Sequence, residues 1–281
     1  MIVIKDPDFF KDWLAGKRIS QGQIGFVPTM GALHQGHIAL IRQARKESGL
    51  VVCSIFVNPT QFNDPKDFQK YPVTIEEDIY QLETAGTDIL FLPSIEGLYP
   101  NGTKDLERYE LGYLESILEG YHRPGHYQGV CQVMSRLLNT VEPDLLFMGQ
   151  KDYQQCMVVS RLIHLMQIDT KLIPCPTIRE ADGLAMSSRN KRLNKEQREK
   201  AVGIYKALNL IKENIGVRKT TALIDEATQL LKKYDFKPDY VAIADAGTLE
   251  QVNEWDGERK LVALIAAFQA EVRLIDNLLI N

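Results

Sequence analysis

Residues 24–57 read IGFVPTMGALHQGHIALIRQARKESGLVVCSIFV: an apolar run, a glycine-bearing turn, a helical pattern and a second apolar run. The first run stops at Pro28, and Ile38 and Ile41 then recur at helical spacing. The second run, residues 50–57, is nearly continuous and β-branched, as is typical of a strand buried on both faces. The pattern predicts a strand–helix–strand unit, the building block of a parallel sheet.

The same alternation continues along the chain. A Thr-Ile-Glu-Glu capping box at Thr74 predicts a helix that ends at Gly86. The predicted segments are, in chain order, helix 74–86, strand 88–92, helix 129–141, strand 145–148, helix 153–166 and strand 172–174. Short links between such units predict an α/β fold, a Rossmann-like doubly wound parallel sheet with helices on both faces.

The sequence changes character near Leu193, where charged amphipathic patterns replace the alternation. Asn194 and Gln197 are spaced as a helix start. The predicted segments that follow are a helix to about residue 214, a helix over 220–233, and strands over 240–243 and 260–267. They predict a smaller α+β domain, so we expect two domains, residues 1–185 and 186–281.

Composition excludes several classes of protein. The 281 residues are 44% hydrophobic and 25% charged, with a net charge of −4, so the chain is neither disordered nor globally basic for nucleic acid or an anionic membrane. The longest apolar runs are far shorter than the roughly 20 residues that span a bilayer. Acidic residues stand in the N-terminal MIVIKDPDFFKDW where a signal peptide needs an apolar run, so we expect a cytoplasmic protein.

The four cysteines are far apart and form no Cys-x-x-Cys pair. They are Cys53, Cys131, Cys156 and Cys175. We expect small buried side chains rather than a disulfide or a structural zinc site.

Polar, glycine-bearing turns follow three predicted strands of the first domain. They are residues 28–37, 58–63 and 149–155, and a fourth polar segment, residues 186–190, precedes the change of domain. In an open parallel sheet, ligands bind beyond the carboxyl ends of the strands. We therefore expect a ligand site at this edge, in a cleft between the two domains.

His34 and His37 are three residues apart, so at the start of a helix both lie on one face. Gly31 and Gly36 leave room for a ring or a phosphate against the backbone, and N–H groups at a helix start attract anions. The pattern favours a cradle for a nucleotide and its phosphates. Two alternatives remain open: a pair of capping histidines, and a metal pair that needs a third ligand.

A resemblance narrows these alternatives. VPTMGALHQGH resembles the His-x-Gly-His signature of class I nucleotidyltransferases, and MSSRN resembles their Lys-Met-Ser-Lys-Ser type loop, with Arg189 in the position of a catalytic lysine. Five further motifs lie between residues 28 and 190: FVNPTQF, YPVTIEED, RPGHYQGV, MGQKDYQQ and IREADGLAMSSRN. Together with the two signatures, these motifs are similar to the pantoate–β-alanine ligase family. Glu77 stands where that family often has aspartate.

The resemblance implies an enzyme, a ligase that forms a C–N bond in pantothenate (vitamin B5) and coenzyme A biosynthesis. The carboxylate of pantoate would attack the α-phosphorus of ATP, expelling diphosphate, and β-alanine would then displace AMP from pantoyl adenylate to give pantothenate. Such catalysis is positioning and charge stabilisation without a protein nucleophile. The resemblance further implies a nucleotide-binding catalytic first domain, a C-terminal lid domain, magnesium with ATP, and a homodimer without nucleic-acid or membrane partners.

The resemblance also implies site residues. The implied catalytic residues are His34, His37, Lys151 and Arg189. The implied ATP-binding residues are Met30, Gly31, His34, His37, Gly149, Lys151, Asp152, Ile178, Met186, Ser187, Ser188 and Arg189. The implied contacts to pantoate and β-alanine are Gln61, Gln155, Asn58 and Arg123. Magnesium is expected on phosphate oxygens and water, with Glu77 or Asp78 as an outer contact.

Three alternative functions differ from this one. Another nucleotidyltransferase of this fold, acting on a phosphorylated acceptor, would favour Arg or Lys where Gln61 and Gln155 stand. A tRNA-charging relative would need an anticodon-binding appendage and a basic surface. A metal-dependent hydrolase would use the histidines His34, His37, His122 and His126.

Overall fold

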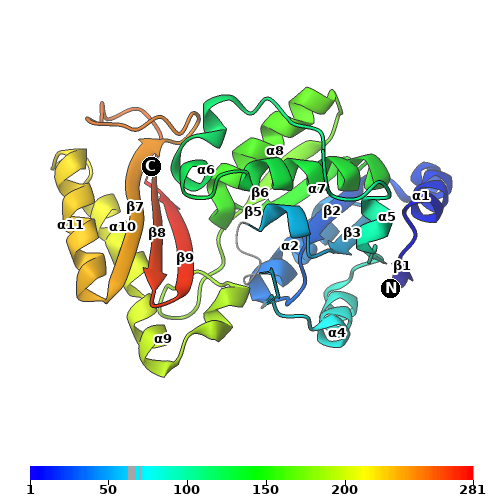
Figure 1. Cartoon of the computed structure of the whole chain (residues 1–281), viewed down its shortest axis with the longest axis horizontal. Coiled ribbons are helices and arrows are strands. Elements are labelled where there is room, and N and C mark those ends of the chain that lie inside the picture. The colour runs from blue at the N-terminus through cyan, green and yellow to red at the C-terminus, as the bar shows by residue number, and fades with distance from the viewer. Residues whose placement is uncertain (63–67, 70, 281) are drawn as a thin grey trace. The chain divides into compact units, whose positions relative to one another are not determined.

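The computed structural model describes residues 1–62, 68, 69 and 71–280. The chain divides into two compact units (Figure 1). The first unit comprises Met1–Gln150 and Gln154–Pro176, and the second comprises Lys151–Tyr153 and Thr177–Asn281. The division falls at Pro176/Thr177, nine residues before the expected start at 186, and the short tract at 151–153 joins the second unit although its chain neighbours belong to the first.

The first unit is built on a six-stranded sheet in which every paired strand is parallel. In spatial order the strands are β1 (Ile2–Ile4), β4 (Ile89–Phe91), β3 (Leu50–Ile55), β2 (Ile24–Thr29), β5 (Leu145–Gly149) and β6 (Lys171–Cys175). From β2 the chain moves outward through β3 and β4, and later through β5 and β6 on the other side. The switch point between β2 and β5 confirms the doubly wound α/β prediction.

Helices cover this sheet. They are α1 (Pro7–Gln21), α2 (Gln35–Glu47), α4 (Ile75–Ala85), α5 (Ile95–Leu98), α6 (Leu118–His122), α7 (His126–Val141) and α8 (Tyr153–Met166). Figure 1 shows α2 and α4 on one side of the sheet and α7 and α8 on the other. A buried cluster that includes Ile41, Val51 and Leu82 joins α2, β3 and α4. All six residues of β3 are buried, as its apolar run predicted.

Short 3-10 helices complete the connections. They are η1 (Pro59–Gln61), η2 (Gly112–Glu115), η3 (Gln150–Asp152) and η4 (Ser188–Arg192). The strand order β3-β2-β5 places the turns after these three strands next to one another, because parallel strands end at the same edge.

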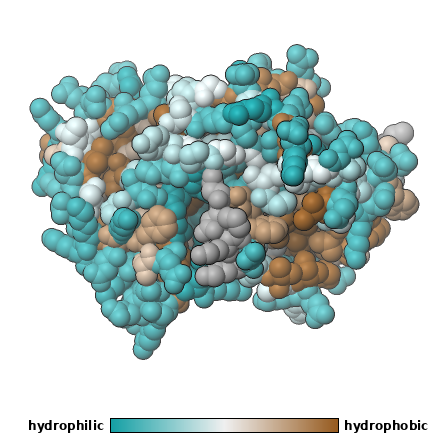
Figure 2. Space-filling view, viewed as in Figure 1, coloured by the Kyte–Doolittle hydropathy of each residue, from teal (hydrophilic) through white to brown (hydrophobic). Residues whose placement is uncertain are grey.

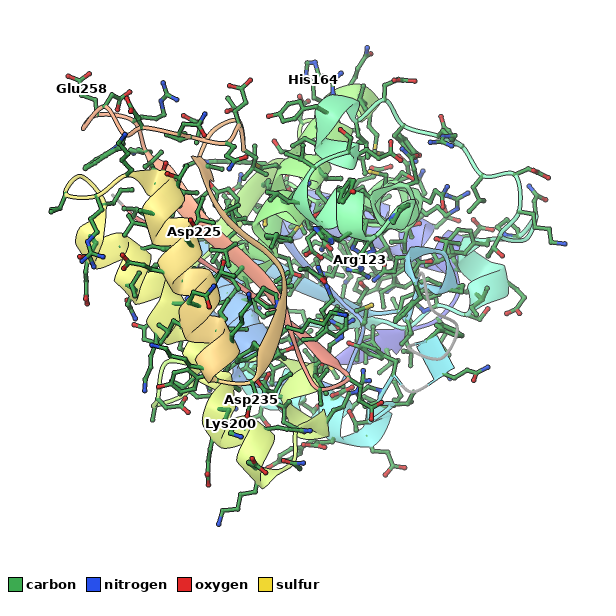
Figure 3. All side chains as sticks on the ribbon, turned by 60° about the vertical axis from the view of Figure 1, so that its left-hand side comes forward. Arg123, His164, Lys200, Asp225, Asp235 and Glu258 are labelled. Atoms are coloured by element: carbon green, nitrogen blue, oxygen red, sulfur yellow. The ribbon has the colours of Figure 1, made fainter. Side chains whose placement is uncertain are left out.

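The second unit holds a three-stranded antiparallel sheet in the order β7 (Phe236–Asp245), β8 (Leu261–Gln269), β9 (Val272–Leu279). Its helices are α9 (Lys195–Ala201), α10 (Gly203–Asn214) and α11 (Thr220–Lys233). A separate core that includes Leu208, Leu231 and Ile265 joins α10, α11 and β8. Lys200 pairs with Asp235 at 2.5 Å, and the two labels stand together in Figure 3. The antiparallel sheet and the helices packed on it form the predicted smaller α+β fold.

Several local predictions differ from the structure. Thr74 begins α4 without a capping box, because its hydroxyl bonds Asp78 instead of a helix-start N–H. The helix expected from Asn194 to 214 is two helices, although its capping box with Gln197 is present. β1 and α1 were not predicted from the sequence. Asp6 caps α1 ahead of Pro7, and α1 buries Phe10 and Leu14 among charged residues.

All four cysteines are buried, which confirms the prediction of small buried side chains. Within the described ranges, no helix is long and apolar enough to cross a membrane. Figure 2 shows apolar surface at the lower right of the view, over the part of the first unit that holds β1 and α4. Ile2, Val3 and Val73 are exposed by 49%, 42% and 73%.

Candidate functional site

The turn between β2 and α2 carries both predicted histidines and contains two successive residues in the left-handed region of the backbone. Gly31 has a φ of +78° and Ala32 a φ of +49°. The Gly31 N–H donates to Thr29 Oγ1 at 3.2 Å, and that hydroxyl donates to the Ser54 carbonyl at 2.8 Å. These bonds fix the turn to β3.

Asp78, in the first turn of α4, holds the same turn. It is 0% exposed and accepts hydrogen bonds from the N–H groups of Ala32 at 2.9 Å and Leu33 at 2.8 Å. The Thr74 hydroxyl donates a third bond at 3.2 Å. This corrects the expectation that Asp78 is an outer contact of magnesium. Its carboxylate is buried and bound to the histidine turn, which it fixes in place.

His34 and His37 form a reciprocal cap at the start of α2. The Gly36 N–H donates to His34 Nδ1 at 3.1 Å, and the His34 N–H donates to His37 Nδ1 at 3.3 Å. The two ring centroids are 4.0 Å apart. Because Nδ1 accepts in both rings, the proton of each neutral imidazole lies on Nε2, which makes Nε2–H a donor. The capping alternative is thus confirmed.

Gln61 and Met30 meet beside this turn. Gln61 Nε2 donates to Met30 Sδ at 2.8 Å, and Asn58 Nδ2 donates to Gln61 Oε1 at 3.3 Å. Asn58 is 1% exposed, and its amide also bonds the Gly129 carbonyl and the Tyr99 hydroxyl. The structure therefore brings three predicted site residues together on η1 and the β2–α2 turn. Asn63, the last residue of the polar turn 58–63, lies outside the residues that the structure describes.

A chain of polar side chains leads from Arg123 to Gln61. Arg123 (labelled in Figure 3) pairs with Glu119 at 3.7 Å and donates to His126 Nε2 at 3.0 Å. His126 Nδ1 donates to the Gln61 carbonyl at 2.8 Å. Sequence reasoning named Arg123 and Gln61 but missed His126 as their connection. Its place in the RPGH motif was the available signal.

Gly149 and Gln155 lie on either side of η3, since Gly149 ends β5 and Gln155 is in the first turn of α8. A Cβ added at Gly149 would meet nothing within 4 Å, so the backbone is open to a close neighbour. Gln154 and Gln155 differ although they are adjacent. Gln154 is 3% exposed and bonds the carbonyls of Leu114 and Ile117, whereas Gln155 is only partly buried in the first turn of α8.

The second unit carries the other predicted ATP-binding residues. Ile178 and Met186 pair across a short hairpin, where the Met186 N–H donates to the Ile178 carbonyl at 2.9 Å. Ser187 caps η4, since its Oγ accepts from the Arg189 N–H at 3.3 Å. Ser188 and Arg189 lie in η4, so the serine–arginine segment is an ordered helical turn.

Arg179 and Gly183 fix this hairpin within the second unit. Arg179 makes two hydrogen bonds, at 2.6 and 3.0 Å, to the buried carboxylate of Asp276 on β9. Burial raises the pKa of Asp276, and the Arg179 guanidinium opposes that shift. The guanidinium lies 4.7 Å from the ring centroid of Tyr205. A Cβ at Gly183 would lie 2.0 Å from the same ring, which explains a glycine with φ +94° there.

Lys151 and Asp152, in η3, belong to the second unit. Asn277 Nδ2 donates to the Lys151 carbonyl at 2.7 Å, and the Tyr153 hydroxyl donates to the Ala246 carbonyl at 2.7 Å. Both bonds join the tract 151–153 to the β7–β9 part of the chain.

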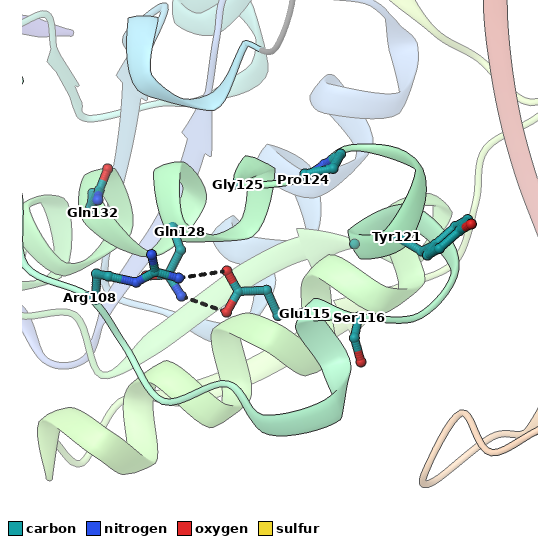
Figure 4. Close-up of a pocket in the computed structure, with 9 residues that line it drawn as sticks. Arg108, Glu115, Ser116, Tyr121, Pro124, Gly125, Gln128 and Gln132 are labelled. Atoms are coloured by element: carbon teal, nitrogen blue, oxygen red, sulfur yellow. Dashed lines mark hydrogen bonds and ion pairs between the residues drawn. The ribbon is translucent and has the colours of Figure 1, made fainter.

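One hollow of the first unit is lined by residues other than the predicted ones (Figure 4). This pocket of about 570 Å³ is lined by the α6–α7 connection and by the Arg108–Glu115 ion pair. Gln128 donates to Glu115 at 2.9 Å beside that pair. Among the described residues that line it, none is a predicted site residue.

Among the described residues, the possible metal ligands are dispersed. In the part of the chain that the structure describes, no group of three His, Cys, Asp or Glu side chains is placed to hold a metal ion. Glu77 is exposed in the first turn of α4 and accepts from Gln81 Nε2 at 3.3 Å. One exposed carboxylate fits an outer contact to magnesium, which keeps phosphate oxygens and water as its main ligands.

Comparison with known proteins gives matches over the whole length. The pantoate-beta-alanine ligase family model matches residues 2–279. A pantothenate synthetase of Cytophaga hutchinsonii is 45% identical and the match covers 100% of this chain and 99% of that protein. A pantothenate synthetase of Pseudomonas fluorescens is 46% identical, with coverage of 95% and 94%.

Solved structures agree. Pantothenate synthetase from Thermus thermophilus has a TM-score of 0.91 at 38% identity and covers 100% of this chain and 99% of its own. Pantoate-beta-alanine ligase from Francisella tularensis, complexed with beta-gamma ATP and beta-alanine, has a TM-score of 0.83 at 39% identity, with coverage of 99% and 97%. The likeness therefore extends over both units.

Proposed function

The chain belongs to the pantoate-beta-alanine ligase family, and from this premise we propose how its own residues carry out the reaction. The enzyme is a ligase that joins pantoate and β-alanine through a C–N bond to give pantothenate, with ATP as co-substrate. The single observation that carries the residue assignment is the reciprocal cap of His34 and His37 at the start of α2. It sets two imidazole N–H donors at a helix N-terminus, where anions are stabilised.

Activation of the carboxylate is the first step. Hydroxide is a poor leaving group, so pantoate attacks the α-phosphorus of ATP, diphosphate leaves, and pantoyl adenylate forms. His34 and His37 donate from Nε2 to phosphate oxygens, and Lys151 and Arg189 supply positive charge. Ser187 Oγ and Ser188 Oγ, near the start of η4, donate to the triphosphate.

Pantoate binding is assigned to the amides of Gln61 and Gln155, which offer both donors and acceptors to its hydroxyl groups and carboxylate. Asn58 and Arg123 act beside them, and the hydrogen bond from His126 to the Gln61 carbonyl supports this assignment. β-Alanine then attacks the acyl carbon from the same pocket, and AMP leaves.

Adenine and ribose are assigned to the backbone at Met30, Gly31 and Ile178, with Met186 beside them, while Gly149 permits close approach and Asp152 accepts from the ribose hydroxyls. Magnesium with ATP would supply further charge at the phosphate oxygens, with Glu77 as an outer contact. The second unit is assigned the role of a lid over ATP.

Isotope exchange between diphosphate and ATP tests the order of steps. Exchange should require pantoate and not β-alanine, because adenylate formation precedes attack by the amine. Exchange without pantoate, or exchange that needs β-alanine, would contradict this order. It would point instead to another nucleotidyltransferase reaction.

The variants His37→Ala and Lys151→Ala should each lower the exchange rate by roughly 10²–10³, the usual cost of losing one preorganised charge-stabilising contact. Exposed residues of the same types provide controls: His164→Ala and Lys232→Ala should leave the rate unchanged. An unchanged rate in folded His37→Ala would remove that histidine from the mechanism.

Assembly as a homodimer in the cytoplasm completes the proposal. Sedimentation equilibrium should give the mass of two chains of 31.9 kDa each. The mass of a single chain across the working concentration range would contradict the dimer.

A further inference from the structure

Two adjacent polar residues lie within the apolar sheet of the second unit. Asp276 and Asn277, on β9, are 3% and 2% exposed. Burial of a carboxylate and an amide is unfavourable unless both are hydrogen-bonded, so their partners indicate what the pair stabilises.

The partner of the Asn277 side chain is a predicted catalytic residue. Its Nδ2 donates to the main-chain carbonyl of Lys151 at 2.7 Å, across 126 positions of sequence. The Tyr153 hydroxyl bonds the Ala246 carbonyl at 2.7 Å, so the tract 151–153 is held at both ends by the second unit. The Lys151 carbonyl is therefore held by one side chain distant in sequence, that of Asn277.

The Asp276 side chain fixes the part of β9 that carries Asn277. One carboxylate oxygen accepts from the Asn277 N–H at 2.8 Å, and both accept from Arg179. The Arg179 guanidinium also donates to the Asn277 carbonyl at 3.1 Å. Burial raises the pKa of Asp276, and the charges of Arg179 and Lys151 oppose that shift.

We propose that Asn277 is a positioning residue for Lys151, and that Asp276 with Arg179 fixes β9 so that the Asn277 amide meets the Lys151 carbonyl. The inference rests on the role proposed above for Lys151 in adenylate formation. Displacing a charge-stabilising group by about 1 Å can cost roughly 100-fold in rate, so one hydrogen bond at its backbone is enough to matter.

The test is diphosphate–ATP exchange by Asn277→Ala and Asn277→Leu; the second variant keeps a similar volume but cannot donate. Each should lower the exchange rate by about 10-fold to 100-fold. Conversion of separately supplied pantoyl adenylate by β-alanine should be unchanged in both variants, since the proposed function of Lys151 is confined to the first step. A matched control is Asn214→Ala, whose amide bonds the Leu210 carbonyl at 2.8 Å in α10 of the same unit.

A double-mutant cycle with Lys151→Ala separates positioning from a general loss of structure. If Asn277 acts through Lys151, Asn277→Ala causes no further loss of exchange in the Lys151→Ala background. An equal loss in both backgrounds, a slowed second step, or wild-type exchange by both Asn277 variants would overturn the proposal. If Lys151→Ala alone leaves exchange unchanged, the proposed role of Lys151 fails, and this inference fails with it for that separate reason.

Discussion

Asp78 illustrates how one residue can organise a site without facing a ligand. Its buried carboxylate accepts from the N–H groups of Ala32 and Leu33, at a turn where Gly31 and Ala32 have positive φ. Such a turn persists only when its surroundings compensate for the strain. The carboxylate provides that compensation, and the histidine cap follows directly in the chain.

Replacement of this carboxylate is the first prediction. Asp78→Asn turns one acceptor into an N–H₂ group that faces backbone donors, so unfolding in urea should show a loss of about 1–3 kcal/mol. Glu77→Gln, at the exposed neighbour, should change stability by less than about 0.5 kcal/mol. Equal stabilities for the two variants would show that the turn does not depend on Asp78.

The buried thiols make a second prediction at this scale. Burial raises the pKa of Cys131 to about 12 and that of Cys175 to about 11. At pH 8 the thiolate fraction is then on the order of 10⁻³ or less. Because all four thiols are buried, a disulfide reagent should find no fast-reacting thiol in the native protein and four per chain after denaturation. A fast native thiol would mean that local opening exposes one of them.

At the scale of elements, α7 approaches η1 closely enough to require a glycine. A Cβ at Gly129 would lie 2.2 Å from the Thr60 carbonyl oxygen, and the Gly129 carbonyl accepts from Asn58. The approach fixes the turn that carries Gln61, so the helix and the pantoate contact are linked.

Gly129→Ala should therefore destabilise the protein by about 1–3 kcal/mol, as overpacking usually does, and should raise KM for pantoate more than KM for ATP. Gly16→Ala is the matched control, because a Cβ there meets nothing within 4 Å in α1. That change should stabilise the helix by about 0.5–1 kcal/mol. A loss of stability with an unchanged KM for pantoate would show that the packing of α7 against η1 does not affect pantoate binding.

An ion pair at the 178–186 hairpin gives a pH prediction. Hydrogen bonding from Arg198 lowers the pKa of Asp182. A lowered folded-state pKa gives stability that is present above the unfolded pKa of about 3.8 and is lost as pH falls through the folded value. Arg198→Met should raise the pKa of Asp182 in NMR titration, and the stability difference between the two proteins should vanish in acid.

The helices and strands show which features can be predicted from the sequence. β3 and α8 were predicted because apolar period and length decide them locally, and α8 begins and ends at the predicted residues. Two features were not predicted: the role of Asp78, and the fact that residues 151–153 belong to the second unit. Each depends on hydrogen bonds between residues far apart in sequence, and no local pattern records those bonds.

The site follows the same rule. Motifs named His34, His37 and Gln61, which the structure places on neighbouring turns of the first unit. They did not reveal the direction of the cap bonds or the link through His126, because ring orientation is set by packing rather than by residue type.

At the scale of the whole molecule, ligand binding should raise the stability of the folded protein. A ligand that binds only the folded protein, at 100 times its Kd, contributes about 2.7 kcal/mol. ATP should thus raise the thermal midpoint by roughly 5–10 °C for a chain of this size. His37→Ala should show a smaller increase and His164→Ala the full one; the same increase in both would remove the imidazole from ATP binding.

The chain passes between its two units three times, after Gln150, after Tyr153 and after Pro176. A gene cut between the codons for Pro176 and Thr177 would therefore not yield one polypeptide per unit. The longer product would lack Asn277, and the shorter would lack Lys151, whose carbonyl is the partner of that amide. Co-expression of the two halves would have to rebuild that bond, so recovery of activity in such a split-gene experiment reports on three residues at the crossing.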